Sequence, residues 1–193
     1  MEQLYYEEPS LSRKDDAIEF INEFYEYKSS INGVGGLNRY LDDYEGWLEK
    51  LKEDCQEVQK ENRVPARTYF LVRESDNRIV GMSNIRLRLN DVLEKSGGHI
   101  GYCIRPTERR KGYNKINLYL ALQVLEKYGI EEAILDADLD NPASWKTMEA
   151  LGGIRIEEYI DEYDGSKSVK YTIPVSQSLK DNESIYESHI HTH

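Results

Sequence analysis

One stretch near the middle of the chain, residues 98–129, constrains the fold more than any other. Residues 99–105 mix β-branched and aromatic side chains, which favours a strand, and Pro106 ends it because proline cannot donate to a strand ladder. From Ile116 onward the apolar residues suit a mostly buried helix that stops at Gly129. Strands and helices alternate around this stretch, with hairpins at both ends of the series, so the chain predicts a mixed α/β sheet.

The segment between that strand and helix is the strongest candidate for a ligand site. It holds four cations in a chain whose net charge is −11: Arg109, Arg110, Lys111 and Lys115. A helix that begins here offers free backbone N–H groups and about half a positive charge, which favours a bound phosphate. Gly112 would let the backbone approach the anion closely. The alternative is a solvated basic turn that leads into a core helix.

Short motifs in and after this stretch carry a family resemblance. Arg109 and Gly112 open the central helix, a later helix opens with Asn141 and Ser144, and residues 151–153 read Leu-Gly-Gly. In this order they resemble the GNAT family of N-acetyltransferases, although Asn114 stands where the family's acetyl-CoA signature usually has Gly or Ala. The resemblance covers residues 68–174, and residues 97–106 are similar to a bacterial subgroup known mainly as predicted acetyltransferases.

This resemblance implies the GNAT acyl-CoA N-acyltransferase fold, an α/β or α+β mixed sheet with splayed central strands and N-terminal helices. A single domain would span residues 1–175, with a strand and a helical acceptor-site part over 1–66 and a cofactor-binding core over 67–175. Residues 176–193 are polar and predict a flexible tail. The three alternating histidines in this tail do not predict a metal site: His189, His191 and His193.

The resemblance also implies acetyl-CoA as co-substrate, with an amine attacking the thioester directly. Backbone N–H groups near Cys103, Ile104 and Arg105 would pair with the pantetheine arm. Asn141 and Ser144 would contact the cofactor from the other side of the splayed strands. The pyrophosphate would lie over one continuous segment: Arg109, Arg110, Lys111, Gly112, Tyr113, Asn114 and Lys115.

The proton donor and acceptor are less well defined. Many relatives place a tyrosine seven residues after the asparagine to protonate the departing thiolate, but this chain has Met148, which cannot donate a proton. Tyr102, Tyr159 or water remain as the acid, or the thiolate leaves unprotonated. His99 is the first choice for the base because its ordinary pKa lies near ~6.5, although a structural histidine is the competing interpretation. Three carboxylates that would act through water are alternatives: Glu157, Glu158 and Asp138.

Composition bounds the setting and the partners. No apolar run approaches the ~20 residues that span a bilayer, and the start of the chain is no signal peptide, so we expect a cytoplasmic, bacterial protein without a membrane partner. Cys55 and Cys103 predict reduced thiols. The net charge of −11 argues against nucleic acid and suits an amine, although acidity also keeps proteins soluble. The resemblance adds a homodimer as one assembly.

The N-terminal half predicts the acceptor side. Helices are expected over residues 17–27 and 37–51, the second with Gly46 as a point where it can break. A hairpin follows, and Arg86, Arg88 and Asn90 share one face of its second strand. These side chains can bind an acidic group on the acceptor, or they form a solvated sheet face.

Two functions therefore stand side by side. The leading interpretation is an acetyl-CoA-dependent N-acetyltransferase that acts on an amine of a small molecule or a protein. The alternative is a non-catalytic acyl-CoA-binding sensor or interaction module on the same fold, which Asn114 and Met148 favour because both depart from the catalytic pattern.

Overall fold

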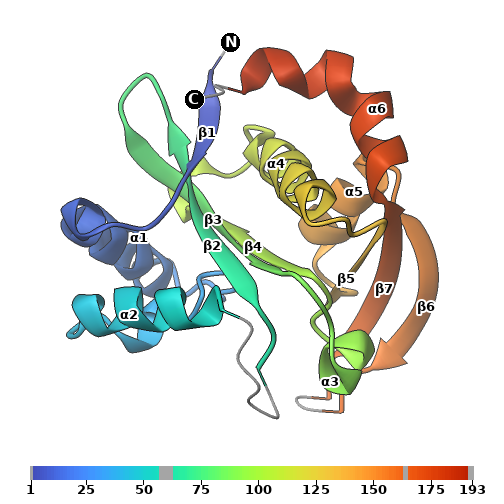
Figure 1. Cartoon of the computed structure of the whole chain (residues 1–193), viewed down its shortest axis with the longest axis horizontal. Coiled ribbons are helices and arrows are strands. Elements are labelled where there is room, and N and C mark those ends of the chain that lie inside the picture. The colour runs from blue at the N-terminus through green and yellow to red at the C-terminus, as the bar shows by residue number, and fades with distance from the viewer. Residues whose placement is uncertain (1, 57–62, 163–164, 191–193) are drawn as a thin grey trace.

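The computed structural model of the chain describes residues 2–56, 63–162 and 165–190. Its strands form two antiparallel sheets, one in the order β1-β2-β3-β4 and one in the order β5-β7-β6 (Figure 1). The strands are β1 (Leu4–Glu7), β2 (Ala66–Arg73), β3 (Arg78–Arg86), β4 (Ile100–Ile104), β5 (Glu132–Asp138), β6 (Ile154–Ile160) and β7 (Lys167–Pro174). The predicted mixed α/β architecture is confirmed.

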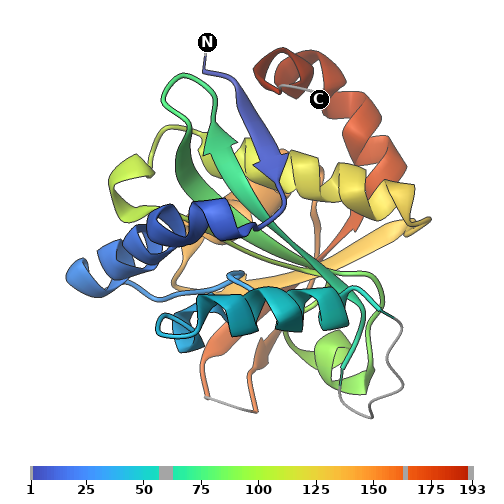
Figure 2. The same ribbon diagram turned by 60° about the vertical axis from the view of Figure 1, so that its left-hand side comes forward.

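Helices cover the sheets in two layers. In Figures 1 and 2, α1 and α2 lie on one side of β2 and β3, whereas α4 and α6 lie on the other side. The α-helices are α1 (Lys14–Glu26), α2 (Tyr44–Asp54), α3 (Asp91–Lys95), α4 (Tyr113–Lys127), α5 (Pro142–Ala150) and α6 (Val175–Tyr186). Short 3-10 turns are η1 (Leu11–Arg13), η2 (Leu37–Arg39), η3 (Pro106–Glu108) and η4 (Glu187–His189). None of the described helices has both the length and the apolar character that a bilayer span requires.

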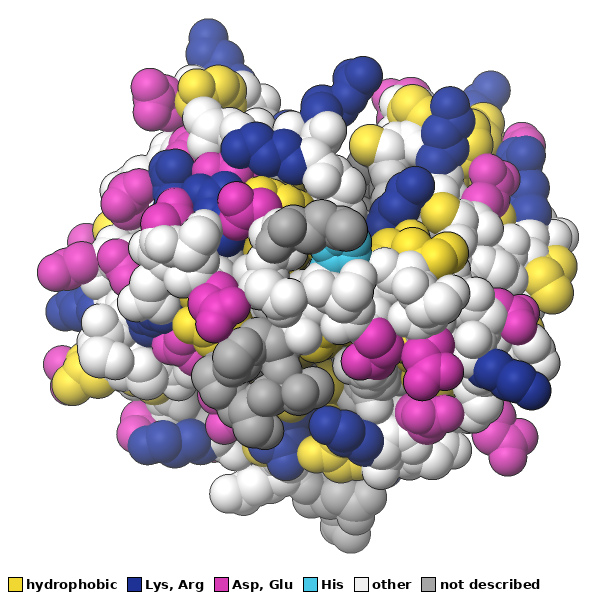
Figure 3. All heavy atoms as spheres, turned by 90° about the horizontal axis from the view of Figure 1, so that it is seen from above, with side chains coloured by type: hydrophobic (Ala, Val, Ile, Leu, Met, Phe, Trp, Pro, Cys, Tyr) yellow, Lys and Arg dark blue, Asp and Glu magenta, His cyan; other side chains and the backbone are white. Residues whose placement is uncertain are grey.

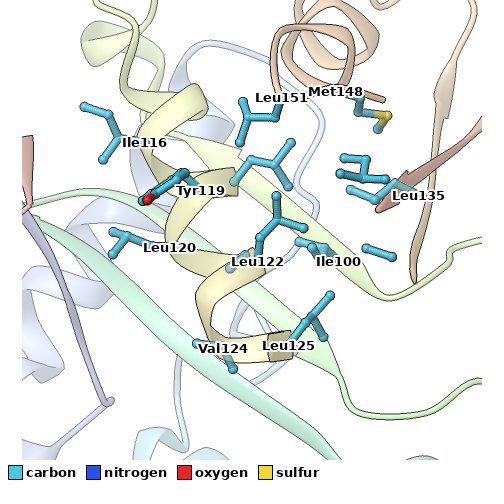
Figure 4. Packing of buried hydrophobic residues seen from close by; sticks show 14 of the residues in the cluster. Ile100, Ile116, Tyr119, Leu120, Leu122, Val124, Leu125, Leu135, Met148 and Leu151 are labelled. Carbon is cyan, nitrogen blue, oxygen red and sulfur yellow. The ribbon is translucent and has the colours of Figure 1, made fainter. Parts of the chain in front are cut away.

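Helix α4 lies at the centre of the larger core. It packs against β3, β4, α5 and α6, and Figure 4 shows its apolar side chains facing those of β5 and α5. Two buried hydrogen bonds fix the orientation of α4: the Asn117 side chain accepts from Ser83 Oγ at 2.9 Å and donates to Met82 O at 3.3 Å. Because both bonds are buried, rotating the helix would leave polar groups unpaired.

The second core lies on the other face of the first sheet. Phe20, Phe24 and Trp47 from α1 and α2 pack there against Phe70 and Met82 of β2 and β3. The expected second helix over residues 37–51 is divided into η2 and α2. The division lies before Gly46, since Asp43 caps α2 by accepting from the Gly46 N–H at 3.1 Å.

The C-terminal segment differs from the predicted flexible tail. Val175–Tyr186 forms helix α6, which packs on α4 through the buried side chains of Val175, Leu179 and Tyr186. Leu4 and Ile190 form a bridge that brings the end of this segment beside β1. The sequence did not predict this helix because the segment has few apolar residues, although those it has recur on one face of the helix. His191 and His193 lie outside the described residues.

Candidate active site

The two sheets meet at His99. Its backbone N–H donates to Ile134 O at 2.7 Å, and its Nδ1 accepts from the Ile134 N–H at 3.0 Å. No strand ladder joins β4 to β5 in the described part of the chain. We call this break the β4–β5 junction. Strand β4 therefore has one edge that faces the junction rather than another strand.

The register of β4 decides which of its amides face that edge. Arg105 N donates to Val80 O at 2.9 Å, so the alternation of an antiparallel ladder directs Cys103 and Arg105 toward β3. The N–H groups of Tyr102 and Ile104 then point into the junction. Of the three amides predicted to meet the pantetheine arm, only that of Ile104 has this direction, and Tyr102 supplies a second that the sequence did not indicate.

The side chains of Cys103 and Arg105 are structural. Cys103 is buried in the second core, and burial raises the pKa of its thiol to about 12, which disfavours a nucleophilic thiolate. The Arg105 guanidinium is 1% exposed and pairs with Glu19 at 2.8 Å and with Glu23 at 3.3 Å. These contacts fix α1 against the end of β4.

The cationic loop follows β4 and is held in place by several polar contacts. Arg109 donates from Nε to Ile104 O at 3.2 Å and from Nη2 to Ser29 Oγ at 2.6 Å. Arg110 is exposed and has a left-handed φ of 68°. Lys111 Nζ lies 2.7 Å from a carboxylate oxygen of Glu108.

Glu108 is a member of this loop that the sequence analysis missed. Its carboxylate is buried and binds Arg73 at 2.7 Å and Arg78 at 3.3 Å as well as Lys111. Burial opposes its ionisation, but the cations, Arg73 first, more than offset this and hold the pKa of the carboxyl below its usual range. Glu108 thus ties the loop to the ends of β2 and β3.

Helix α4 begins directly after the loop. Gly112 has φ 84°, and a Cβ placed on it would meet nothing within 4 Å, so its backbone is open to a ligand. Lys115 is exposed, and Tyr113 is buried with its hydroxyl 3.3 Å from Arg73 Nη1. Asn114 donates weakly to Thr147 Oγ1 at 3.4 Å, and its Oδ1 is buried without a hydrogen-bond partner among the described residues.

Tyr102 and Ser144, predicted for different roles, are brought together. The Tyr102 hydroxyl, on β4, lies 2.9 Å from Ser144 Oγ, on α5. Burial raises the pKa of Tyr102 to about 12, so its hydroxyl is protonated at neutral pH and can donate. Asn141 caps α5 by accepting from the Ser144 N–H at 3.3 Å, which fixes Ser144 in place.

The geometry does not support the predicted bases His99 and Glu157. The Nδ1 of His99 is occupied by the Ile134 N–H, and burial, with nearby Arg86, lowers the pKa of the ring. Glu157 is exposed on β6, the strand of the second sheet farthest from β5, where it binds Lys170 at 2.9 Å. Tyr159 on the same strand donates to Asp136 at 2.7 Å. The sequence could not show that two strands separate Glu157 from the junction.

Comparisons with known proteins identify the family of this chain. The family model described as the acetyltransferase (GNAT) family matches residues 35–152, more than half of the chain. The chain belongs to the GNAT acetyltransferase family. Membership identifies it as an acetyltransferase enzyme, and the predicted resemblance is confirmed.

Solved structures show the same fold at low sequence identity. Spermidine/spermine N-acetyltransferase SpeG from Vibrio cholerae, in complex with manganese ions, is 14% identical with a TM-score of 0.63, covering 93% of this chain and 96% of that one. A candidate GNAT-family acetyltransferase from Bordetella pertussis is 13% identical with a TM-score of 0.63, covering 87% of this chain and 93% of that one. A search of curated proteins finds no match.

Within this GNAT fold, Met148 has a purely apolar role. It is 1% exposed and packs with Leu135 and Leu151 in the core around α4 (Figure 4). The position where many relatives carry a tyrosine is therefore part of the core. Over the face drawn in Figure 3, both acidic and basic side chains are present, and the net charge of the whole sequence is −11.

Proposed function

We propose that this GNAT protein transfers the acetyl group of acetyl-CoA to an amine by direct attack within a ternary complex. The observation that carries the proposal is the unpaired edge of β4, where the amides of Tyr102 and Ile104 face the junction beside the open start of α4. Amides in such an edge can bind an extended amide-containing chain as a strand would. The helix start and its cations suit a diphosphate.

The residues present fit acetyl-CoA. Gly112 has no neighbour that blocks a phosphate, and Arg110 and Lys115 are exposed cations beside it. The unpaired Oδ1 of Asn114 lacks a donor that a ligand N–H or O–H would supply. Asn114, the departure from the family signature, is thus compatible with a ligand.

The chain's own groups account for two parts of the reaction. The amine nitrogen forms a bond to the thioester carbonyl carbon, the C–S bond breaks with its electron pair left on sulfur, and the amine proton passes to water. Amides that face the junction can stabilise the negative charge that develops on the carbonyl oxygen. The protonated Tyr102 hydroxyl can give its proton to the departing thiolate and recover one from Ser144 or water.

Two measurements test the proposal. Acetyl-CoA and CoA should raise the melting temperature, since a ligand that binds only the native state stabilises it. Thiol release should then appear with at least one member of a panel of amines. Stabilisation without release on any amine would favour the non-catalytic sensor, and no stabilisation by either nucleotide would contradict both functions.

A further inference from the structure

The acceptor side of β4 contains a half-buried cation that has no carboxylate partner among the described residues. This cation is Arg86, at the end of β3, and its Nη1 donates to the carbonyls of Gly97 and Gly98 at 2.8 Å each. No carboxylate of the described residues lies within ion-pairing distance of its guanidinium. The strongly buried side chains of Arg13, Arg73 and Arg105 each have at least one.

Asp136 is the carboxylate that acts on Arg86 over a longer distance. It is already engaged by the Tyr159 hydroxyl at 2.7 Å and by the Gly97 N–H. Burial lowers the pKa of Arg86, and the attraction of Asp136 opposes this shift. The two glycine carbonyls occupy Nη1 of this half-buried guanidinium, whereas Nη2 has no hydrogen-bond partner among the described residues and is not sealed from solvent, so an anionic ligand can reach it.

The Arg86 guanidinium lies close to Gly101 of β4. A Cβ placed on Gly101 would lie 4.0 Å from Arg86 Nη2 and 3.2 Å from the Cα of Gly33. Gly33 belongs to the loop between α1 and η2, so Arg86 lies on the acceptor side of β4, opposite to α4. Gly101 directly precedes Tyr102, whose amide faces the junction.

We propose that Arg86 binds the carboxylate of the acceptor, which makes the acceptor an amino acid or a related amino-carboxylate. This inference rests on the acetyl transfer proposed above. A planar guanidinium matches a carboxylate in a two-point contact, and the amine of an α-amino acid lies only two bonds from its carboxylate carbon. Carboxylate binding at Arg86 would therefore hold the amine near the junction. Spermidine, which lacks a carboxylate, should be a poor acceptor.

Arg88 and Asn90, which were predicted to share one strand face with Arg86, do not share this role. Arg88 is exposed, and the Asn90 side chain caps α3 by accepting from the Leu93 N–H at 3.0 Å. Arg88 is consequently a matched control: it has the same charge, lies two residues further along the chain and is solvated.

The test compares each common amino acid with its amide in the thiol-release assay. The amide keeps the amine and the side chain but removes the negative charge. We expect wild type to prefer its best acid over the amide by about 100-fold in kcat/KM, because the neutral amide cannot form the charged two-point contact with the guanidinium. Arg86→Gln should bring this ratio near one, whereas Arg88→Gln should retain it. Arg86→Lys, which keeps the charge without the fork, should give an intermediate ratio.

The outcomes separate the two proposals. Wild-type protein that acetylates amides, or spermidine, as well as the acids would overturn the role of Arg86 and leave acetyl transfer intact. Absence of thiol release with every acid, amide and polyamine would overturn the proposed function itself. The wild-type ratio needs no variant, so it decides the question even where Arg86→Gln fails to fold after losing its bonds to Gly97 and Gly98.

Discussion

The hydroxyl of Tyr102 on β4 lies 2.9 Å from Oγ of Ser144 at the start of α5, so one hydrogen bond joins β4 to the helix that follows β5. The amide of the same tyrosine faces the β4–β5 junction. One residue therefore supplies both a protonated hydroxyl and a backbone N–H. Met148, at the position where many family members carry a tyrosine, is buried in the core and supplies neither to the junction.

Tyr102→Phe should lower kcat by about 100-fold with little change in the KM for acetyl-CoA, because it removes a proton donor but leaves the amide. Tyr119→Phe is the control, since the Tyr119 hydroxyl bonds to Glu187 at 3.1 Å, away from the junction. Steady-state kinetics checks both. Wild-type turnover in Tyr102→Phe would show that water protonates the thiolate or that it leaves unprotonated.

Gly112→Glu should weaken acetyl-CoA binding by at least about 100-fold, because it sets a carboxylate against the diphosphate. Gly129→Glu is a matched control at the other end of α4: its φ is 73°, against 84° for Gly112, and a Cβ at either position meets nothing within 4 Å. Both variants bear the same backbone strain. Titration calorimetry with equal affinity for the two would mean that the loop is not the phosphate site.

Glu108→Gln should destabilise the protein by about 1.5 to 3 kcal/mol, since it removes the buried carboxylate shared by Arg73 and Lys111, although Arg73 keeps its pair with Asp76 at 2.6 Å. Glu49→Gln, which breaks an exposed pair with Lys52, should cost less than about 1 kcal/mol. Urea unfolding measures both. Similar losses for the two variants would show that the Glu108 cluster does not anchor the loop.

Lowering the pH should reduce the stability of the protein through protonation of His99. Because the folded-state pKa of His99 lies below its ordinary value, the unfolded chain binds the proton more readily, and stability falls as pH drops from about 7.5 through the ordinary histidine pKa. The variant His99→Gln should show a smaller loss of stability over this range than wild type. Identical pH profiles for His99→Gln and wild type would contradict a buried neutral histidine.

Helix α6 should contribute to stability as a packed element. Leu179→Ala should cost about 3 kcal/mol, because Leu179 is 7% exposed in the core around α4. Ile185→Ala, at 53% exposed in the same helix, should change stability by no more than about 0.5 kcal/mol. Equal and small effects of the two substitutions in thermal or urea unfolding would contradict a packed helix and support the flexible tail that the sequence predicts.

The sequence by itself determined the features that depend on a few neighbouring residues. Pro106 and Gly112 end a strand and open a helix because their backbone preferences act locally, and Asn141 caps α5 for the same reason. The alternation of these elements was enough to predict the mixed α/β fold. The order and spacing of the motifs were enough to indicate the family.

Only the tertiary structure decided what each candidate side chain does. Whether an amide of β4 faces β3 or the junction depends on strand register, which pairs residues far apart in the chain. Glu157 is distant from the junction because β7 lies between β6 and β5, and Met148 is apolar core because α5 packs on α4. Within the described residues, Arg86 donates to two glycine carbonyls instead of a carboxylate, and no local sequence pattern records such non-local neighbours.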